Sequence, residues 1–236
     1  MKKLHLCLYF LFLCSFSLHV HAQGNVTHER LMDEDDGKNW LSWGRTYKEQ
    51  RFSPLDQIDE TNVDELGLAW SFGLEAFRGV GGTPIVVDGV IYTTSAWTVT
   101  RALDAKTGEL LWTYDPETPR AWGRYACCGP VSRGLAVWEG MVYVGSLDGR
   151  LFGLDAQTGE VIWEVDTFIF KDRAYTSSGA PEVAGDVVVI GNAGADYDAR
   201  GYVSAYDLKT GEFAWRFFTV PGDPELGFEH PEMELA

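Results

Sequence analysis

Two adjacent cysteines, Cys127 and Cys128, are the residues of this chain best suited to do chemistry. The other two cysteines, Cys7 and Cys14, lie in an N-terminal stretch that looks like a cleaved export signal, so the mature protein would keep only this pair in an oxidising compartment. Neighbouring Cα atoms lie about 3.8 Å apart, closer than the roughly 4.4–6.8 Å usual for a disulfide. We therefore expect a strained disulfide, of the kind kept at functional sites; two reduced thiols are the alternative.

An arginine, Arg133, follows the cysteine pair by five residues, with Val131 between them. The planar guanidinium is suited to bind carboxylates with two parallel hydrogen bonds. The segment Cys-Cys-x-x-Val-x-Arg-Gly thus combines a sulfur pair with an anion-recognising group. In so acidic a protein, a surface ion pair is the alternative role for Arg133.

A second segment, from Gly191 to Asp196, carries three small residues followed by a carboxylate. Small residues let a backbone approach a ligand closely, which gives a role to Ala193, Gly194 and Ala195. Asp196 is a legitimate ligand for a hard cation. This segment therefore predicts a close ligand contact beside a metal-binding carboxylate.

The chain ends and composition limit the function classes. Residues 1–22 combine a basic start, an apolar run and a small-residue cleavage site, which is the layout of a secretory signal peptide. The apolar run is too short to span a membrane comfortably, so we expect a periplasmic mature protein. The net charge of −16 disfavours nucleic-acid binding, because a phosphate backbone would be repelled.

A repeat predicts the fold. Three segments match one another without gaps and end in tryptophan: 102–112, 153–163 and 205–215. Their aspartates, Asp104, Asp155 and Asp207, lie 51 and then 52 residues apart. A constant period near 50 residues is typical of propellers and solenoids.

Within each repeat the pattern is that of short strands and tight turns. The runs 90–95, 141–145 and 187–191 are rich in β-branched and aromatic residues and follow glycine-containing turns. In the unit Asp-x-x-Thr-Gly, the aspartate can accept hydrogen bonds from backbone amides and glycine supplies a positive φ. Four antiparallel strands in each repeat would form one blade of an all-β propeller.

The repeat resembles that of the eight-bladed pyrroloquinoline quinone (PQQ) dehydrogenases, and so do the segments 40–47, 51–58 and 66–71. The resemblance implies an eight-bladed β-propeller of four-stranded antiparallel blades. In it Trp112, Trp163 and Trp215 each pack on the turn of the next blade. Residues 23–236 would form the N-terminal portion, roughly four blades and about the first half of the ring.

The resemblance also implies roles for the residues above. PQQ is a flat quinone with three carboxylates, and the vicinal disulfide would form one side of its sandwich. The implied cofactor-binding residues are Cys127, Cys128, Val131, Arg133, Ser178, Ala193, Gly194 and Ala195, and Asp196 would bind Ca²⁺ or another hard cation. Two positions depart from the family, which usually has glutamate where this chain has Asp196 and Gly81.

The function implied is a periplasmic, PQQ- and Ca-dependent dehydrogenase that oxidises primary alcohols and passes electrons to a cytochrome c-type acceptor or a haem domain. The family's catalytic aspartate lies in later blades, so we expect no catalytic residue in this chain. Because Cys-x-x-Cys-His is absent, haem c is expected only in a missing C-terminal part. The alternatives are a non-catalytic scaffold of the outer-membrane assembly type and a decayed dehydrogenase.

Overall fold

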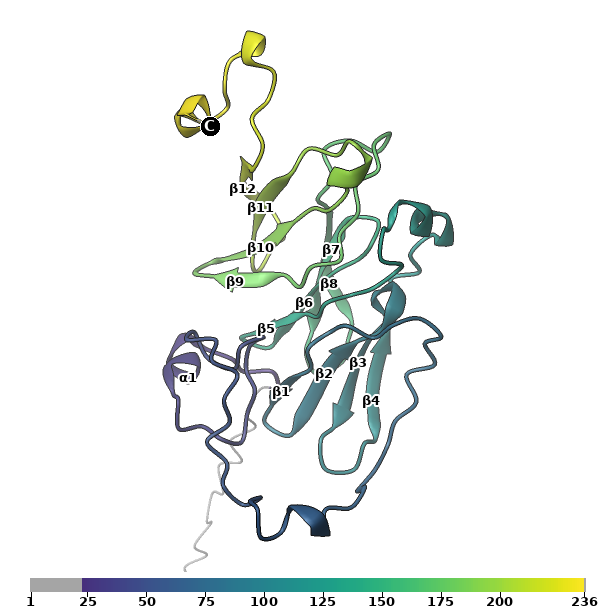
Figure 1. Cartoon of the computed structure of the whole chain (residues 1–236), viewed down its shortest axis with the longest axis vertical. Coiled ribbons are helices and arrows are strands. Elements are labelled where there is room, and N and C mark those ends of the chain that lie inside the picture. The colour runs from purple at the N-terminus through teal and green to yellow at the C-terminus, as the bar shows by residue number, and fades with distance from the viewer. Residues whose placement is uncertain (1–22, 236) are drawn as a thin grey trace, which may run out of the picture.

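The computed structural model describes residues 23–235, which consist mainly of short strands and connections (Figure 1). The signal peptide predicted over residues 1–22 lies outside the described residues. The described part has one short α-helix, α1 (His28–Met32). Its 3₁₀ turns are η1 (Val63–Glu65), η2 (Ala96–Thr98), η3 (Arg120–Tyr125), η4 (Ala195–Tyr197), η5 (Pro224–Leu226) and η6 (Pro231–Leu235). No helix among these residues is long and apolar enough to cross a membrane.

The strands form three antiparallel sheets of four strands each, and every sheet follows the order of the chain (Figure 1). The first sheet contains β1 (Ile85–Val87), β2 (Val90–Thr94), β3 (Thr100–Asp104) and β4 (Leu110–Tyr114). The second contains β5 (Ala136–Trp138), β6 (Met141–Gly145), β7 (Arg150–Asp155) and β8 (Val161–Asp166). The third contains β9 (Glu182–Ala184), β10 (Val187–Gly191), β11 (Tyr202–Asp207) and β12 (Phe213–Phe218). These sheets confirm the predicted four-stranded antiparallel blades.

The described residues form three complete four-stranded sheets, and the count of roughly four blades stays a prediction. Residues 33–84 contain no strand and reach the first sheet through an isolated bridge between Trp40 and Val86. The segment 66–71 has the composition of a strand, but no other strand lies beside it to complete a ladder of hydrogen bonds.

The tryptophans link each repeat to the next, as predicted. The indole N–H of Trp112 donates to the carbonyl of Ala156 at 3.0 Å, and that of Trp163 donates to the carbonyl of Leu208 at 3.0 Å. Trp70 makes the same contact with Ala105 at 3.2 Å, so the segment 66–71 carries the docking residue without the strand. Trp215 lies on β12 and remains 44% exposed.

The repeat turn is built by its aspartate. Asp155 Oδ1 accepts hydrogen bonds from the backbone N–H groups of Gln157 and Thr158 and from the Thr158 hydroxyl. The same pattern recurs at Asp207, where bonds from the amides of Thr210 and Lys209 lower the pKa of the carboxyl below its ordinary value. The turn therefore follows from local sequence alone.

The N-terminal segment packs against the first two sheets. Val26, Leu31 and Leu41 are buried in one core cluster with β1 and β5 residues such as Val87 and Val137. The backbone N–H of Glu139 donates to the carbonyl of Val26 at 3.0 Å. This segment therefore packs against the first strand of each of these two sheets.

The order of strands separates two ends of the molecule. In an antiparallel meander, the first-to-second and third-to-fourth strand turns lie at one end, and the second-to-third turns and the connections between sheets lie at the other. The repeat turns occupy the first end. The connections 115–135, 167–181 and 192–201, which carry the predicted site residues, therefore share the second end.

Replacing Gly159 by alanine tests the tryptophan docking. Its φ is +74°, and an added Cβ would lie 2.6 Å from the Trp112 ring; Gly185 has a φ of +62° and open space around it. Both alanine variants lose about 1–2 kcal/mol through the left-handed backbone. Gly159→Ala is expected to lose about 1–3 kcal/mol more, because the indole must move. Urea unfolding of both variants measures the difference, and equal losses would contradict docking as a source of stability.

A second prediction concerns the ion pair between Arg200 and Glu229. The two guanidinium nitrogens lie 2.5 and 2.9 Å from the carboxylate oxygens and lower the pKa of Glu229 to about 2 from 4.5. A lowered folded-state pKa gives stability that is present above pH 4.5 and is lost as the pH falls toward 2. In Arg200→Gln, carboxyl NMR should show Glu229 titrating near its ordinary pKa. Arg173→Gln is the control and should leave that titration unchanged.

Candidate functional site

The predicted site residues meet at the end of the sheets opposite the repeat turns. Arg133 donates its backbone N–H to the carbonyl of Ser178 at 2.9 Å, and its guanidinium donates to the Ser178 hydroxyl. The backbone of Ala193 in turn pairs with that of Thr176, two residues before Ser178, through hydrogen bonds of 2.7 and 3.1 Å. The structure thus brings together three connections that are far apart in the sequence.

The two cysteines are exposed and carry free thiols in the structure. Their Sγ atoms lie 3.1 Å apart in hydrogen-bond contact. This contact, followed by burial and by the charge of Asp196, raises the pKa of Cys127, while Arg133 acts in the opposite direction. The predicted disulfide remains a prediction.

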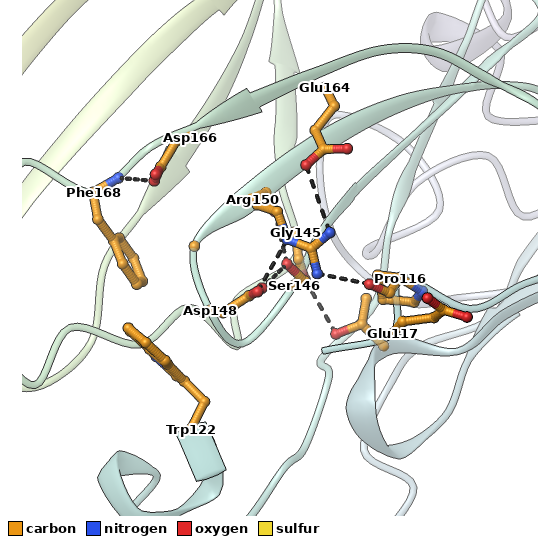
Figure 2. Close-up of polar contacts among 12 residues, drawn as sticks. Pro116, Glu117, Trp122, Gly145, Ser146, Asp148, Arg150, Glu164, Asp166 and Phe168 are labelled. Atoms are coloured by element: carbon orange, nitrogen blue, oxygen red, sulfur yellow. Dashed lines mark hydrogen bonds and ion pairs between the residues drawn. The ribbon is translucent and has the colours of Figure 1, made fainter. Parts of the chain in front are cut away.

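The loop that carries the cysteines is anchored by Trp122 of η3. Its indole N–H donates to the carbonyl of Tyr175 at 2.9 Å. Its ring stacks on Phe168, with centroids 6.4 Å apart, and Figure 2 shows the two rings facing each other. Phe168 in turn lies so close to Gly149 that an added Cβ there would overlap its ring. Trp122 therefore holds the cysteine loop against the connection 167–181, at a point a few residues before Cys127.

Trp97 holds the other side of this loop and was not predicted from the sequence. Trp97 and Thr98 have φ values of 65° and 64°, a left-handed conformation that is costly for residues other than glycine. The backbone N–H of Trp97 donates to the carbonyl of Pro130 at 2.8 Å, and the Thr98 hydroxyl donates to Gly145 at 3.3 Å. No spacing in the sequence signals this strained pair.

Arg150 ties the second sheet to the connection before it (Figure 2). Its guanidinium lies 3.0 Å from the carboxylate of Asp148, 3.5 Å from that of Glu164 and 2.6 Å from the carbonyl of Pro116. Asp148, which is 9% exposed, also accepts a hydrogen bond from the Ser146 hydroxyl. The charge-assisted bonds fix the base of the cysteine-bearing connection.

The Gly191–Asp196 segment is a tight turn. Ala193 and Thr176 exchange two backbone hydrogen bonds of 2.7 and 3.1 Å. Gly194 has a φ of +118°, and an added Cβ would lie 2.3 Å from the carbonyl of Ala174. Only glycine fits there, because the loop at Ala174 packs against it. The close approach to a ligand that the sequence suggests for Ala193, Gly194 and Ala195 stays a prediction.

The carboxylates that follow this turn differ in their partners. Asp196 lies exposed in η4, and Asp198 lies 2.5 Å from Arg173 in an ion pair. Among the described residues, no group of three or more histidine, cysteine, aspartate or glutamate side chains could hold a metal ion. Asp196 therefore offers a single carboxylate toward a cation.

Val131 and Gly81 complete the predicted surroundings. Val131 is half-buried, and its N–H donates to the carbonyl of Gly129 at 2.8 Å within the cysteine loop. A Cβ added at Gly81 would meet only the carbonyl of Ser132, at 3.9 Å. A side chain at position 81 would therefore have room beside the loop that carries Arg133.

The raised pKa of Cys127 gives a test of this geometry. In the reduced protein, Cys128→Ala should lower the pKa of Cys127 toward its ordinary value, because the Sγ–Sγ hydrogen bond is lost. The pH dependence of iodoacetamide alkylation should shift to lower pH, since the thiolate is the nucleophile. Arg133→Gln should shift it to higher pH. An unchanged profile in both variants would exclude these contacts as the cause.

Known proteins match both the sequence and this arrangement. Residues 40–234 match the PQQ family described as "Glucose/ethanol/alcohol dehydrogenase, beta-propeller domain". Quinohemoprotein alcohol dehydrogenase ADH-IIG of Pseudomonas putida is 56% identical over 214 residues, which are 90% of this chain and 30% of that protein. The 1-butanol dehydrogenase (cytochrome c) of Thauera butanivorans is 52% identical over 200 residues, 85% of this chain and 29% of that protein.

Solved structures agree with the sequence matches. The ADHIIG structure from Pseudomonas putida HK5 superposes with a TM-score of 0.89 at 55% identity, over 92% of this chain and 32% of the other. A europium-containing methanol dehydrogenase gives a TM-score of 0.78 at 36% identity, over 84% and 35% of the two chains. The chain thus spans about a third of the proteins it matches. By its repeat, its sheets and these matches, the chain belongs to the PQQ alcohol dehydrogenase β-propeller family.

Proposed function

We propose that this chain forms the N-terminal, quinone-binding part of a periplasmic PQQ-dependent dehydrogenase that oxidises primary alcohols. The observation that carries the proposal is that the loop of the Cys127–Cys128 pair, the Arg133–Ser178 contact and the Gly191–Asp196 turn share one end of the sheets. The names of the alcohol dehydrogenases that match the chain support the reaction class.

The residues fit a flat, polyanionic quinone. Arg133 is exposed and contacts the Ser178 hydroxyl, so both can turn donors toward one carboxylate of the cofactor. The exposed cysteine pair presents a polarizable surface on which a planar ring can rest. When bound, the quinone supplies the acceptor for a hydride or its equivalent. This chain's residues hold and orient the ring.

The metal of the site is proposed to be Ca²⁺ or another hard cation, with Asp196 as one oxygen ligand. Aspartate is one methylene shorter than the glutamate usual in the family, so the ion must lie closer to the η4 backbone or be reached through water. A similar methanol dehydrogenase is described as europium-containing, which supports a choice wider than Ca²⁺.

The electron acceptor is proposed to be a cytochrome c or a haem domain. The support is the word quinohemoprotein in one relative's name and cytochrome c in another's. Export to the periplasm rests on the signal-peptide layout of residues 1–22.

A decayed dehydrogenase is the second candidate, and Gly81 favours it. The family usually places glutamate there, and the structure leaves open space at this position. A non-catalytic scaffold is less favoured, because a scaffold needs neither the cysteine pair nor the Arg133–Ser178 contact.

Binding of PQQ to the chain tests the proposal. Titration of PQQ, followed by tryptophan fluorescence, should show saturable binding that Arg133→Gln weakens about 10- to 100-fold, because hydrogen bonds to charged groups contribute about 1.5–3 kcal/mol. Arg124→Gln is the matched control: it removes an exposed arginine on the same connection, bonded to Tyr125, and should bind PQQ normally.

The outcomes separate the candidates. Saturable binding that is lost in Arg133→Gln supports a working quinone site. Weak binding that tightens in Gly81→Glu supports the decayed enzyme, because only the missing side chain is then limiting. If no variant binds PQQ, the non-catalytic scaffold is the candidate function that remains.

A further inference from the structure

A second cavity lies beside the first sheet, apart from the residues of the quinone site. It has a volume of about 500 Å³ and lies between the segment 74–78, η2 and the end of β4. Its lining includes neither cysteine, nor Arg133, Ser178 or Asp196. Three arginines line this cavity in a chain of net charge −16.

Arg101 on β3 is the central residue of this cavity. It is 8% exposed, and its Nη1 donates to the Ser95 hydroxyl at 3.0 Å. Among the described residues, no ion pair involves Arg101. A guanidinium has five N–H donors, and burying its charge without a counter-charge is costly. Arg101 therefore has donors available for an anion that enters the cavity.

Two exposed arginines, Arg78 and Arg120, complete the positive lining. The guanidinium of Arg120 lies over the Trp97 ring, 4.4 Å from its centre, in a cation–π contact. Two carboxylates, Glu75 and Asp115, also line the cavity, but an Asp115 oxygen accepts the backbone N–H of Glu117 at 2.8 Å. Three positive charges thus face two negative ones, and the balance favours an anion.

The remaining lining is mixed. Leu74, Trp97 and Val99 contribute apolar surface, and Ser95 and Thr113 contribute hydroxyl groups. A cavity with apolar walls and a few convergent polar groups is the usual form of a small-molecule site. The combination suits a molecule with one oxyanion and a short apolar body, and suits a bare inorganic anion poorly.

We infer that this cavity binds an organic monocarboxylate, with its carboxylate on Arg101 and Arg120 and its apolar body against Trp97. Binding in this cavity does not require PQQ, so it is tested separately from the proposed function. Trp97 connects the two sites, because its backbone N–H donates to the carbonyl of Pro130 in the cysteine loop.

Isothermal titration of the chain with benzoate, in the absence of PQQ, tests the inference. Benzoate should bind saturably, and Arg101→Gln should weaken binding at least about tenfold, since a charge-assisted pair is lost. Arg120→Gln should also weaken it, and because that side chain is exposed its loss leaves the fold intact. Lys106→Gln, which removes an exposed charge on the first repeat turn, is the control and should bind as the parent does.

Three results would overturn the inference. The first is an absence of benzoate binding at millimolar concentration. The second is unchanged affinity in Arg120→Gln together with unchanged affinity in an Arg101→Gln protein whose circular dichroism matches the parent. The third is inorganic phosphate binding as tightly as benzoate, because the apolar walls would then contribute nothing.

Discussion

The contact between a tryptophan indole and the turn of the following repeat is the interaction on which the rest of the structure depends. Each docked indole donates to a backbone carbonyl, as Trp112 does to Ala156, and lies against a glycine at which an added Cβ would overlap the ring. The contact sets the distance and angle between neighbouring sheets. Because the same turn recurs with nearly the same period, the sheets follow one another as blades.

The docking of the tryptophans on the repeat turns also determines how the loops at the opposite end of the sheets are placed. Once the sheets are fixed, the connections between them converge, and residues 45 positions apart, such as Arg133 and Ser178, come into contact. The convergent loops are then held by packing of their own. Trp122 stacks on Phe168, and Arg150 reaches the carbonyl of Pro116. The loops of the site are therefore anchored at several points by contacts with the sheets and with one another.

Charge distribution completes this arrangement. The chain carries a net charge of −16, which repels anions in general. Its arginines at this end of the sheets gather where anionic ligands are expected, with Arg133 beside the cysteine pair and Arg101 buried in the neighbouring cavity. A polyanionic quinone can bind such a protein only where positive charge is concentrated in this way.

The sequence by itself determined the repeat, the turns and the strands. Asp155 and Gly159 act through hydrogen bonds and a backbone angle within a few residues, and such local effects can be read from spacing. The resemblance identified the cysteine pair, Arg133 and Ser178, but it could not show that they meet. Only the tertiary structure decided the number of complete sheets, the docking of Trp70 without a strand, the strain at Trp97 and the burial of Arg101. These features arise from packing between distant segments, and no local pattern specifies which distant segments will touch.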